Sequence, residues 1–163
     1  MEVRSVETIV RVLNDAGVRY LIVGGLAVSA HGYVRLTRDV DIVFALDPAN
    51  ASFGLETLLR IGYRLAIPAS PQQFADEQTR ENWRRSKGMI VLKLWSDEHR
   101  RTPVDVFVYE PFPFTTEAAH ASHMEIAPGV LAPVVSYETL LEMKRTAGRP
   151  HDLLDIEELG RMR

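Results

Sequence analysis

Four short apolar runs lie along the chain, and each is bounded by glycine or by polar residues. They are YLIV at 20–23, DVDIVF at 39–44, MIVLKLW at 89–95 and VDVFVY at 104–109. Runs of this length that are rich in β-branched and aromatic residues predict buried strands. The polar turn 96–102 joins the last two runs, so we expect them to form a hairpin. A further short strand is expected at 130–135.

Apolar residues spaced three and four positions apart predict helices between and after these strands. The expected helices cover residues 5–16, 26–31, 51–61, 72–85, 136–147 and 150–163. Ser5 and Ser136 are candidate N-caps, and Gly17 and Gly148 are expected to end their helices. The segment 111–133 contains four prolines and is expected to be largely irregular. With no repeat or linker, the pattern predicts one α+β (α/β) domain over residues 1–163.

Composition narrows the class of protein without naming a function. The 163 residues are 46% hydrophobic and 25% charged, as in ordinary globular proteins, and the net charge is only -3. This balance gives no overall attraction to nucleic acid or anionic membranes. The absence of cysteine excludes disulfides and a thiolate zinc site. Because no signal peptide or membrane-spanning run is present, we expect a cytoplasmic protein with no membrane partner.

Acidic residues inside apolar strands are the main chemical signal. Asp39 and Asp41 are spaced i, i+2, so both side chains project from one face of an extended segment. At a separation of about 7 Å they repel by about 2–3 kcal/mol unless solvent or a cation lies between them. Asp105 lies in an equally apolar strand. Three acids on two strands suit Mg²⁺ or Mn²⁺; alternatively, they form ion pairs with Arg35, Arg38 or Lys93.

Gly24 and Gly25 stand where a predicted strand meets a predicted helix. Backbone amides at such a junction attract anions, and glycine lets a phosphate approach closely. A Gly-Gly pair alone is usually only a tight turn. It becomes more specific here because Asp-Val-Asp begins fourteen residues after Gly25.

The order Gly-Gly, short helix, Arg35-x-Thr37-x-Asp39-x-Asp41 and distant Asp105 resembles the nucleotidyltransferase superfamily, which has the polymerase-beta-like fold. Within it, the chain resembles the branch that holds AbiEii-type toxins and small aminoglycoside or lincosamide nucleotidyltransferases. The resemblance implies a nucleotidyltransferase fold with a mixed central β-sheet flanked by helices. It also covers the tail LEMKRTAGRPHDLLD at 141–155.

The resemblance implies roles for individual residues. Asp39, Asp41 and Asp105 would be catalytic and would bind Mg²⁺ or Mn²⁺. At the nucleotide the resemblance implies Lys144, Arg149, Asp152 and Asp155, which join Gly24 and Gly25. Arg38, in the basic loop before the acids, would either steady the phosphates or pair with the acids. For Lys144, pairing with Asp152 or Asp155 to hold two helices together is an equal and compatible interpretation. Two departures stand out: Gly25 replaces the usual serine, which leaves no hydroxyl there, and His151 replaces a frequent lysine.

The leading hypothesis is a metal-dependent enzyme that moves NMP from an NTP to a hydroxyl of RNA, protein or a small molecule. A second hypothesis is a non-catalytic nucleotidyltransferase-fold partner in a toxin-antitoxin-like two-gene system, with a cognate partner protein or as an oligomer. A glycosyltransferase DxD motif would leave Gly24, Gly25 and Asp105 unexplained. Basic residues around Trp83 (Arg80, Arg84, Arg85 and Lys87) indicate either an acceptor contact or a solvated helix face. His120 and His123 are a weak candidate metal pair.

Overall fold

A computed structural model describes all residues from Met1 to Arg163. Its centre is a seven-stranded mixed sheet with the strand order β3-β4-β5-β2-β1-β7-β6. The strands are β1 (Tyr20–Val23), β2 (Val40–Phe44), β3 (Tyr63–Leu65), β4 (Val91–Ser96), β5 (Val104–Phe107), β6 (Ser122–Ala127) and β7 (Val130–Val134). β2 pairs in parallel with β5 and β1 with β7, whereas the other neighbours are antiparallel.

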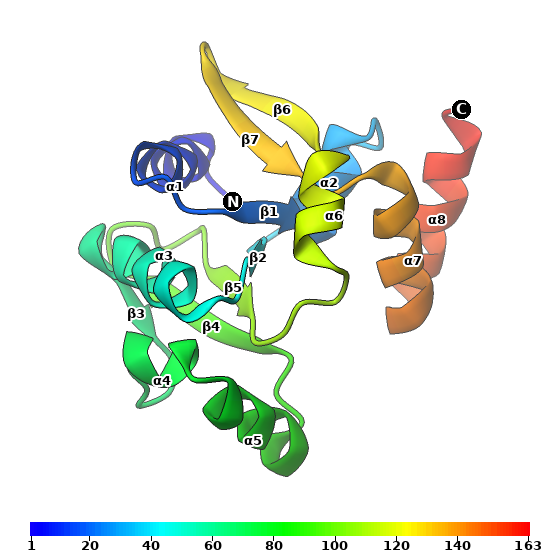
Figure 1. The fold of residues 1–163 in the computed structure, drawn as a ribbon. Coiled ribbons are helices and arrows are strands. Elements are labelled where there is room, and N and C mark those ends of the chain that lie inside the picture. The colour runs from blue at the N-terminus through cyan, green and yellow to red at the C-terminus, as the bar shows by residue number, and fades with distance from the viewer.

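Eight helices surround the sheet (Figure 1). They are α1 (Val3–Asp15), α2 (Gly24–Ala30), α3 (Pro48–Arg60), α4 (Pro71–Ala75), α5 (Glu77–Lys87), α6 (Phe114–Ala119), α7 (Tyr137–Ala147) and α8 (Pro150–Arg161). α3 packs on the face that carries Phe44, and Gly54 allows this because a Cβ there would lie 3.0 Å from the Phe44 ring. α2, α7 and α8 lie at the other side of the sheet (Figure 1).

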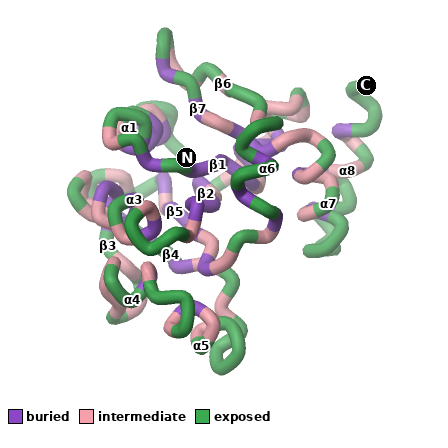
Figure 2. Tube along the Cα trace, viewed as in Figure 1, coloured by how far each residue is buried: buried purple, intermediate pink, exposed green.

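The hydrophobic core follows the central strands. All four residues of β1 are buried, and β2 is buried except at Asp41. Figure 2 shows the buried residues concentrated along these strands, whereas the outer sides of α5, α7 and α8 are exposed. Burial alternates along β4, where Leu92 and Leu94 enter the core while Lys93 and Trp95 remain exposed. This alternation leaves the face of the sheet that carries Lys93 free of core packing along β4.

Most predicted elements are confirmed, including the β4–β5 hairpin, the Ser136 cap and the Gly148 stop. Three expectations were wrong. The segment 111–133 is structured, since it contains α6 and β6 and leads into β7. The expected helix 72–85 is two helices separated at Asp76, whose side chain caps α5. Ser5 is not an N-cap, because α1 begins at Val3 and the Ser5 hydroxyl is buried against His99.

No helix in the structure is both long enough and apolar enough to cross a lipid bilayer.

Candidate functional site

Strand register brings the acidic residues to one face of the sheet. Asp41 on β2 lies directly opposite Asp105 on the parallel neighbour β5, and Lys93 lies opposite Asp105 on β4. Residues paired in this way project from the same side of a sheet. Asp39 comes just before β2, two residues from Asp41, and is also half-buried. The backbone therefore places the three acidic residues on one side of the sheet, as the sequence predicts.

The two glycines lie beside Asp41 and Thr37. Gly24 has a positive φ of 65°, and a Cβ there would lie only 2.7 Å from Cγ of Asp41. A Cβ at Gly25 would lie 2.8 Å from Cβ of Thr37. Side chains at either position would displace these neighbours, so the Gly-Gly pair lets Asp41 and Thr37 lie against the beginning of α2.

Only one of the three acids has a protein partner. Lys93 Nζ lies 3.2 Å from Oδ2 of Asp105. The Lys93 side chain is 67% exposed whereas that of Asp105 is only 12% exposed, so Lys93 can turn into solvent while Asp105 stays buried. Asp39 and Asp41 have no hydrogen-bond or ion-pair partner. Because no fully buried side-chain oxygen lacks a partner, their carboxylate oxygens retain some contact with solvent.

The pKa of Asp41 reflects the absence of a hydrogen-bond or ion-pair partner. Burial, followed by the negative charges of Asp105 and Asp39, raises the pKa of Asp41 from 3.8 to about 7. Burial also raises the pKa of Asp105, while its contact with Lys93 works in the opposite direction. For both carboxyls, burial and the neighbouring carboxylates outweigh the opposing effect of the cations, which are Lys144 and Arg149 for Asp41 and Lys93 for Asp105.

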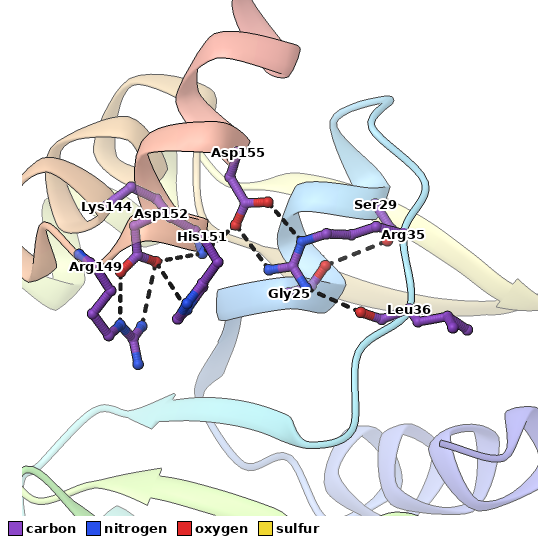
Figure 3. A network of polar contacts seen from close by, with 9 residues as sticks. All are labelled: Gly25, Ser29, Arg35, Leu36, Lys144, Arg149, His151, Asp152 and Asp155. Carbon is purple, nitrogen blue, oxygen red and sulfur yellow. Dashed lines mark hydrogen bonds and ion pairs between the residues drawn. The ribbon is translucent and has the colours of Figure 1, made fainter.

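Lys144 is the centre of a buried ionic network between α7, α8 and the loop after α2 (Figure 3). Its Nζ lies 3.0 Å from Asp152 and 2.7 Å from Asp155. Arg149 also donates to Asp152, with its Nε 2.7 Å away, and Arg35 Nε donates to Asp155 at 2.6 Å. The Lys144 side chain is only 6% exposed. The helix-pinning interpretation of Lys144 is therefore what the contacts describe.

Opposing effects act on the pKa of Asp152. Burial alone would raise it, but hydrogen bonds from Arg149 and Lys144 hold the pKa at about 2. Asp152 is therefore an ionised structural partner at neutral pH. Arg149 and Lys144 both border the same cleft as Asp41, but the Arg149 side chain is 62% exposed whereas that of Lys144 is 6% exposed.

A cleft of about 1040 Å³ runs between the acid-bearing face and α7. Gly24, Asp41 and Asp105 lie along it, and Arg149 approaches from the beginning of α8. Farther along, it is lined by aromatic residues that include Phe107 and Tyr109, whose ring centroids are 5.9 Å apart. Ligand pockets commonly measure 300–1,000 Å³. This cleft is therefore large enough for a nucleotide.

No protein-family model matches the sequence, and no characterised protein matches it by sequence. Solved structures do match. A lincosamide antibiotic adenylyltransferase, LnuA, bound to lincomycin superposes with a TM-score of 0.59 and 18% identity, over 91% of this chain and 89% of its own. The antibiotic-resistance factor ANT(2'')-Ia with adenylyl-2''-tobramycin gives 0.58 and 14%, over 96% and 86%. An antigenic nucleotidyltransferase-like protein from Paracoccidioides brasiliensis gives 0.61 and 19%, over 97% and 75%.

The chain has the nucleotidyltransferase fold. The expected fold class is thereby confirmed, as is the expected likeness to lincosamide and aminoglycoside enzymes. These matches extend over 91% to 97% of the chain, so the sheet and most of its surrounding helices belong to the shared architecture. Because the identities lie between 14% and 19%, they establish the fold and leave the chemistry to this chain's own residues.

The donor set of this nucleotidyltransferase fold suits a hard divalent cation. Asp39, Asp41 and Asp105 offer only carboxylate oxygens, which Mg²⁺ and Mn²⁺ prefer, and two of them have no competing partner. Their side chains do not form a closed cage, since no three acidic or histidine side chains gather at ligating distances anywhere in the chain. The chemistry of these residues therefore fits Mg²⁺, and their exact ligand geometry stays a prediction.

Several predicted site residues are not brought to the cleft. Arg38 is exposed and forms no ion pair, and neither it nor Gly25 borders the cleft. The basic segment around Trp83 is not a continuous contact surface. Arg80 is buried and donates to the carbonyl of Phe74 at 2.6 Å, and the Arg84 guanidinium lies 4.0 Å from the centroid of the Tyr109 ring. His120 and His123 lie on different elements, at the end of α6 and in β6.

Sequence analysis missed the aromatic part of the cleft. Phe107 and Tyr109 were counted only as members of a strand, although their i, i+2 spacing places them with Asp105 on one side. Glu117 was missed as well. It is buried and accepts hydrogen bonds from the backbone of Ser136 and the hydroxyl of Thr139, both at 2.6 Å, so that α6 is tied to the start of α7. Glu117 lies in the proline-rich segment 111–133, which was expected to be irregular, so this contact was not predicted.

Proposed function

We propose that this protein is a metal-dependent nucleotidyltransferase that moves NMP from an NTP to a hydroxyl group and releases pyrophosphate. One observation carries the proposal: Asp41 and Asp105 lie side by side at a large cleft, and Asp39 and Asp41 have no protein partner. Burying carboxylates together is costly unless a cation joins them. A purely structural role would have supplied arginine or lysine partners, as it does for Asp152 and Asp155.

The chain's own residues have distinct roles in this scheme. The acceptor hydroxyl oxygen attacks the α-phosphorus, the bond from that phosphorus to the α,β-bridging oxygen breaks, and pyrophosphate leaves with the bond electrons. Asp105 helps to remove the hydroxyl proton, and Lys93 can leave Asp105 because the lysine side chain is 67% exposed. Mg²⁺ or Mn²⁺ held by Asp39, Asp41 and Asp105 would offset the negative charge of the triphosphate.

Cationic and glycine residues complete the nucleotide site in this proposal. Gly24 lets the phosphates approach the backbone next to Asp41. Arg149 and Lys93 are both exposed cations at the cleft, and because Lys93 is paired with Asp105, we assign to Arg149 the phosphate contact that sequence analysis gave jointly to Lys144. Lys144 and Asp152 act one step away by fixing Arg149 and α8. Arg38 lies outside the cleft, so its only role in this proposal is to attract the nucleotide as it approaches.

The acceptor is the least defined part of the reaction. RNA, protein and small molecules all carry suitable hydroxyl groups. Two matched structures are antibiotic adenylyltransferase complexes, which supports testing small hydroxyl-bearing molecules first. A cleft of about 1040 Å³ leaves space beside a nucleotide for part of such an acceptor.

The test uses α-phosphate-labelled NTPs with Mg²⁺ or Mn²⁺ and a panel of aminoglycosides, lincosamides, tRNA and other RNAs. We expect label transfer with pyrophosphate release, and loss of both in Asp41→Asn. Asp97→Asn, in the exposed β4–β5 turn, is the matched control that should retain activity. Absence of nucleotide binding in the wild-type protein, or equal binding by Asp41→Asn, would refute the proposal.

A non-catalytic partner protein is the second candidate function, and one observation favours it. Val34 and Leu36 in the loop before β2 are 82% and 98% exposed, which suits contact with a cognate protein of a toxin-antitoxin-like pair. An Asp39→Ala/Asp41→Ala variant that keeps its biological effect and its complex with a neighbouring gene product would favour this candidate. Loss of the effect together with nucleotide binding would favour the enzyme.

A further inference from the structure

The loop between α2 and β2 presents a row of functional side chains towards the site. From Gly32 to Asp39 burial alternates strictly, with the odd-numbered residues half-buried and the even-numbered residues exposed. Alternation with a period of two means that the loop is extended although it pairs with no strand. Arg35, Thr37 and Asp39 therefore project to the same side as Asp41, while Val34, Leu36 and Arg38 project outward.

Three members of this row, counting Asp41 at its end, already have a role in the structure or in the proposed reaction. Arg35 binds Asp155 through two hydrogen bonds of 2.6 and 2.8 Å (Figure 3). Asp39 and Asp41 belong to the acidic cluster. Thr37 stands between Arg35 and these acids, and neither the fold nor the proposed reaction yet uses its hydroxyl.

The position of Thr37 is defined by Gly25. A Cβ added at Gly25 would overlap the Thr37 hydroxyl and would lie 2.8 Å from its Cβ. The absence of a side chain at Gly25 thus leaves a space that the side chain of Thr37 fills. The sequence suggested that Gly25 leaves the site without a hydroxyl, but the structure supplies one from the neighbouring loop.

The Thr37 hydroxyl is unused and accessible. It makes no hydrogen bond within the protein, and because no buried side-chain oxygen lacks a partner, this oxygen is open to solvent. A hydroxyl carries one donor and two acceptor positions. Thr37 lies against Gly25, just outside the residues that line the cleft, and the adjacent Gly24 borders the cleft beside Asp41. A phosphate seated at Gly24 would therefore present an anionic oxygen close to this donor.

We propose that the Thr37 hydroxyl donates a hydrogen bond to a phosphate oxygen of the bound nucleotide. This inference rests on the proposed function and adds a nucleotide-binding residue that lies outside the acidic cluster. Hydrogen bonds to charged groups are about twice as strong as neutral ones, so the hydroxyl should contribute measurably to affinity. A threonine that only fills space over Gly25 would contribute shape alone.

Thr37→Val separates these two roles because it keeps the branched shape and removes the donor. We expect Thr37→Val to weaken binding of a fluorescent ATP analogue with Mg²⁺ by about 10-fold or more, in line with a charged hydrogen bond. Thr37→Ser should bind within about 3-fold of wild type, because the donor is retained. Thr115→Val makes the same change on the exposed side of α6 and should leave binding unchanged.

Relocating the hydroxyl provides a second, independent test. Gly25→Ser alone should weaken binding, because its Cβ overlaps Thr37. Combining Gly25→Ser with Thr37→Gly removes the overlap and returns a hydroxyl to nearly the same point, so affinity should exceed that of either single variant. Thermal unfolding without nucleotide identifies any variant that is simply misfolded.

The outcomes distinguish this inference from the proposed function. A wild-type protein that binds no nucleotide overturns both. A wild-type protein that binds and transfers nucleotide, together with a Thr37→Val variant of unchanged affinity, overturns the role of Thr37 alone. Loss of affinity in Thr37→Val with equal loss in Thr37→Ser would also contradict it, because the donor would then be irrelevant.

Discussion

Asp41 carries an energetic cost that the rest of the fold does not offset. It is half-buried, it adjoins two other carboxylates, and its pKa is raised to about 7 by burial and by the charges of Asp105 and Asp39. Local destabilisation of this kind clusters where a ligand completes the charge balance. The residue is therefore expected to favour binding at the expense of the stability of the unliganded protein.

Asp41→Asn should therefore stabilise the free protein while abolishing Mg²⁺-dependent nucleotide binding. Removing the repelling charge at pH 8 should raise stability by about 1 kcal/mol or more, equivalent to a Tm increase of about 2–4 °C per kcal/mol for a chain of this size. Thermal unfolding with and without Mg²⁺ and NTP measures both effects. A lower Tm in the absence of ligand would show that Asp41 is instead a stabilising structural residue.

At the level of elements, α7 and α8 are joined to the loop before β2 by a chain of alternating charges. Arg35, Asp155, Lys144, Asp152 and Arg149 follow one another in this chain (Figure 3). Lys144 is the only cation in this chain of charges that pairs with two carboxylates, and its side chain is only 6% exposed. The position of Arg149 at the cleft depends on it.

Lys144→Met should destabilise the protein strongly. It leaves two aspartates 1% exposed with fewer counter-charges, and breaking a buried pair costs about 3–5 kcal/mol. Because Arg35 and Arg149 remain, we expect about 3 kcal/mol by urea unfolding. Lys87→Met, an exposed residue of α5, should change stability by less than about 0.5 kcal/mol. Equal effects of the two substitutions would disprove the central role of Lys144.

The same network predicts a loss of stability in acid. The pKa of Asp152 is about 2 in the folded protein, below its unfolded value of 3.8, so its contribution is complete above about pH 4 and disappears as the pH falls towards 2. The shift corresponds to about 2 kcal/mol. Urea unfolding of the wild type and Asp152→Asn should therefore give a difference that shrinks between pH 5 and pH 2.5. A difference that stays constant would place the stabilisation elsewhere.

For the whole molecule, the two faces of the mixed sheet have different roles. One face carries the core with α3, while the other carries the acids, the cleft and α7. A ligand that binds only the folded protein stabilises it by mass action, with about 2.7 kcal/mol at 100 times its Kd.

Mg²⁺ together with the preferred NTP should raise the Tm of the wild-type protein by about 5–10 °C at saturating concentration. Comparing the four NTPs in the same assay would identify the preferred base. Asp39→Ala/Asp41→Ala should show no shift, and NTP without a divalent cation should show much less. A shift that is independent of the cation would exclude the metal-dependent scheme.

The sequence predicts those parts of this molecule that depend on local pattern. β1, β2, β5 and β7 were recognisable as short apolar runs, and the acids stood out because charged residues interrupt those runs. β6 was missed because it is an edge strand whose residues are mostly half-buried or exposed, so it lacks an apolar stripe. The break at Asp76 was missed because one capped turn separates two amphipathic segments.

Contacts between distant residues could not be predicted from pattern alone. The pairing of Arg35 with Asp155 joins positions 120 residues apart, and the approach of Thr37 to Gly25 depends on how the intervening loop folds back. The partner of Asp105 was left open among three basic residues, and only the register of β4 selects Lys93. Local chemistry therefore identified the acids, whereas tertiary structure decided which cations remain available for phosphate.

The placement of the counter-charges of Lys144 has a consequence for the order of folding. Asp152 and Asp155 lie on α8, which follows α7 along the chain, so Lys144 cannot be buried without a large penalty until α8 has docked. The sheet can assemble earlier, because all seven strands precede α7. The cleft wall should consequently form last, and a released chain that ends at His151 should have a folded sheet but no functional pocket.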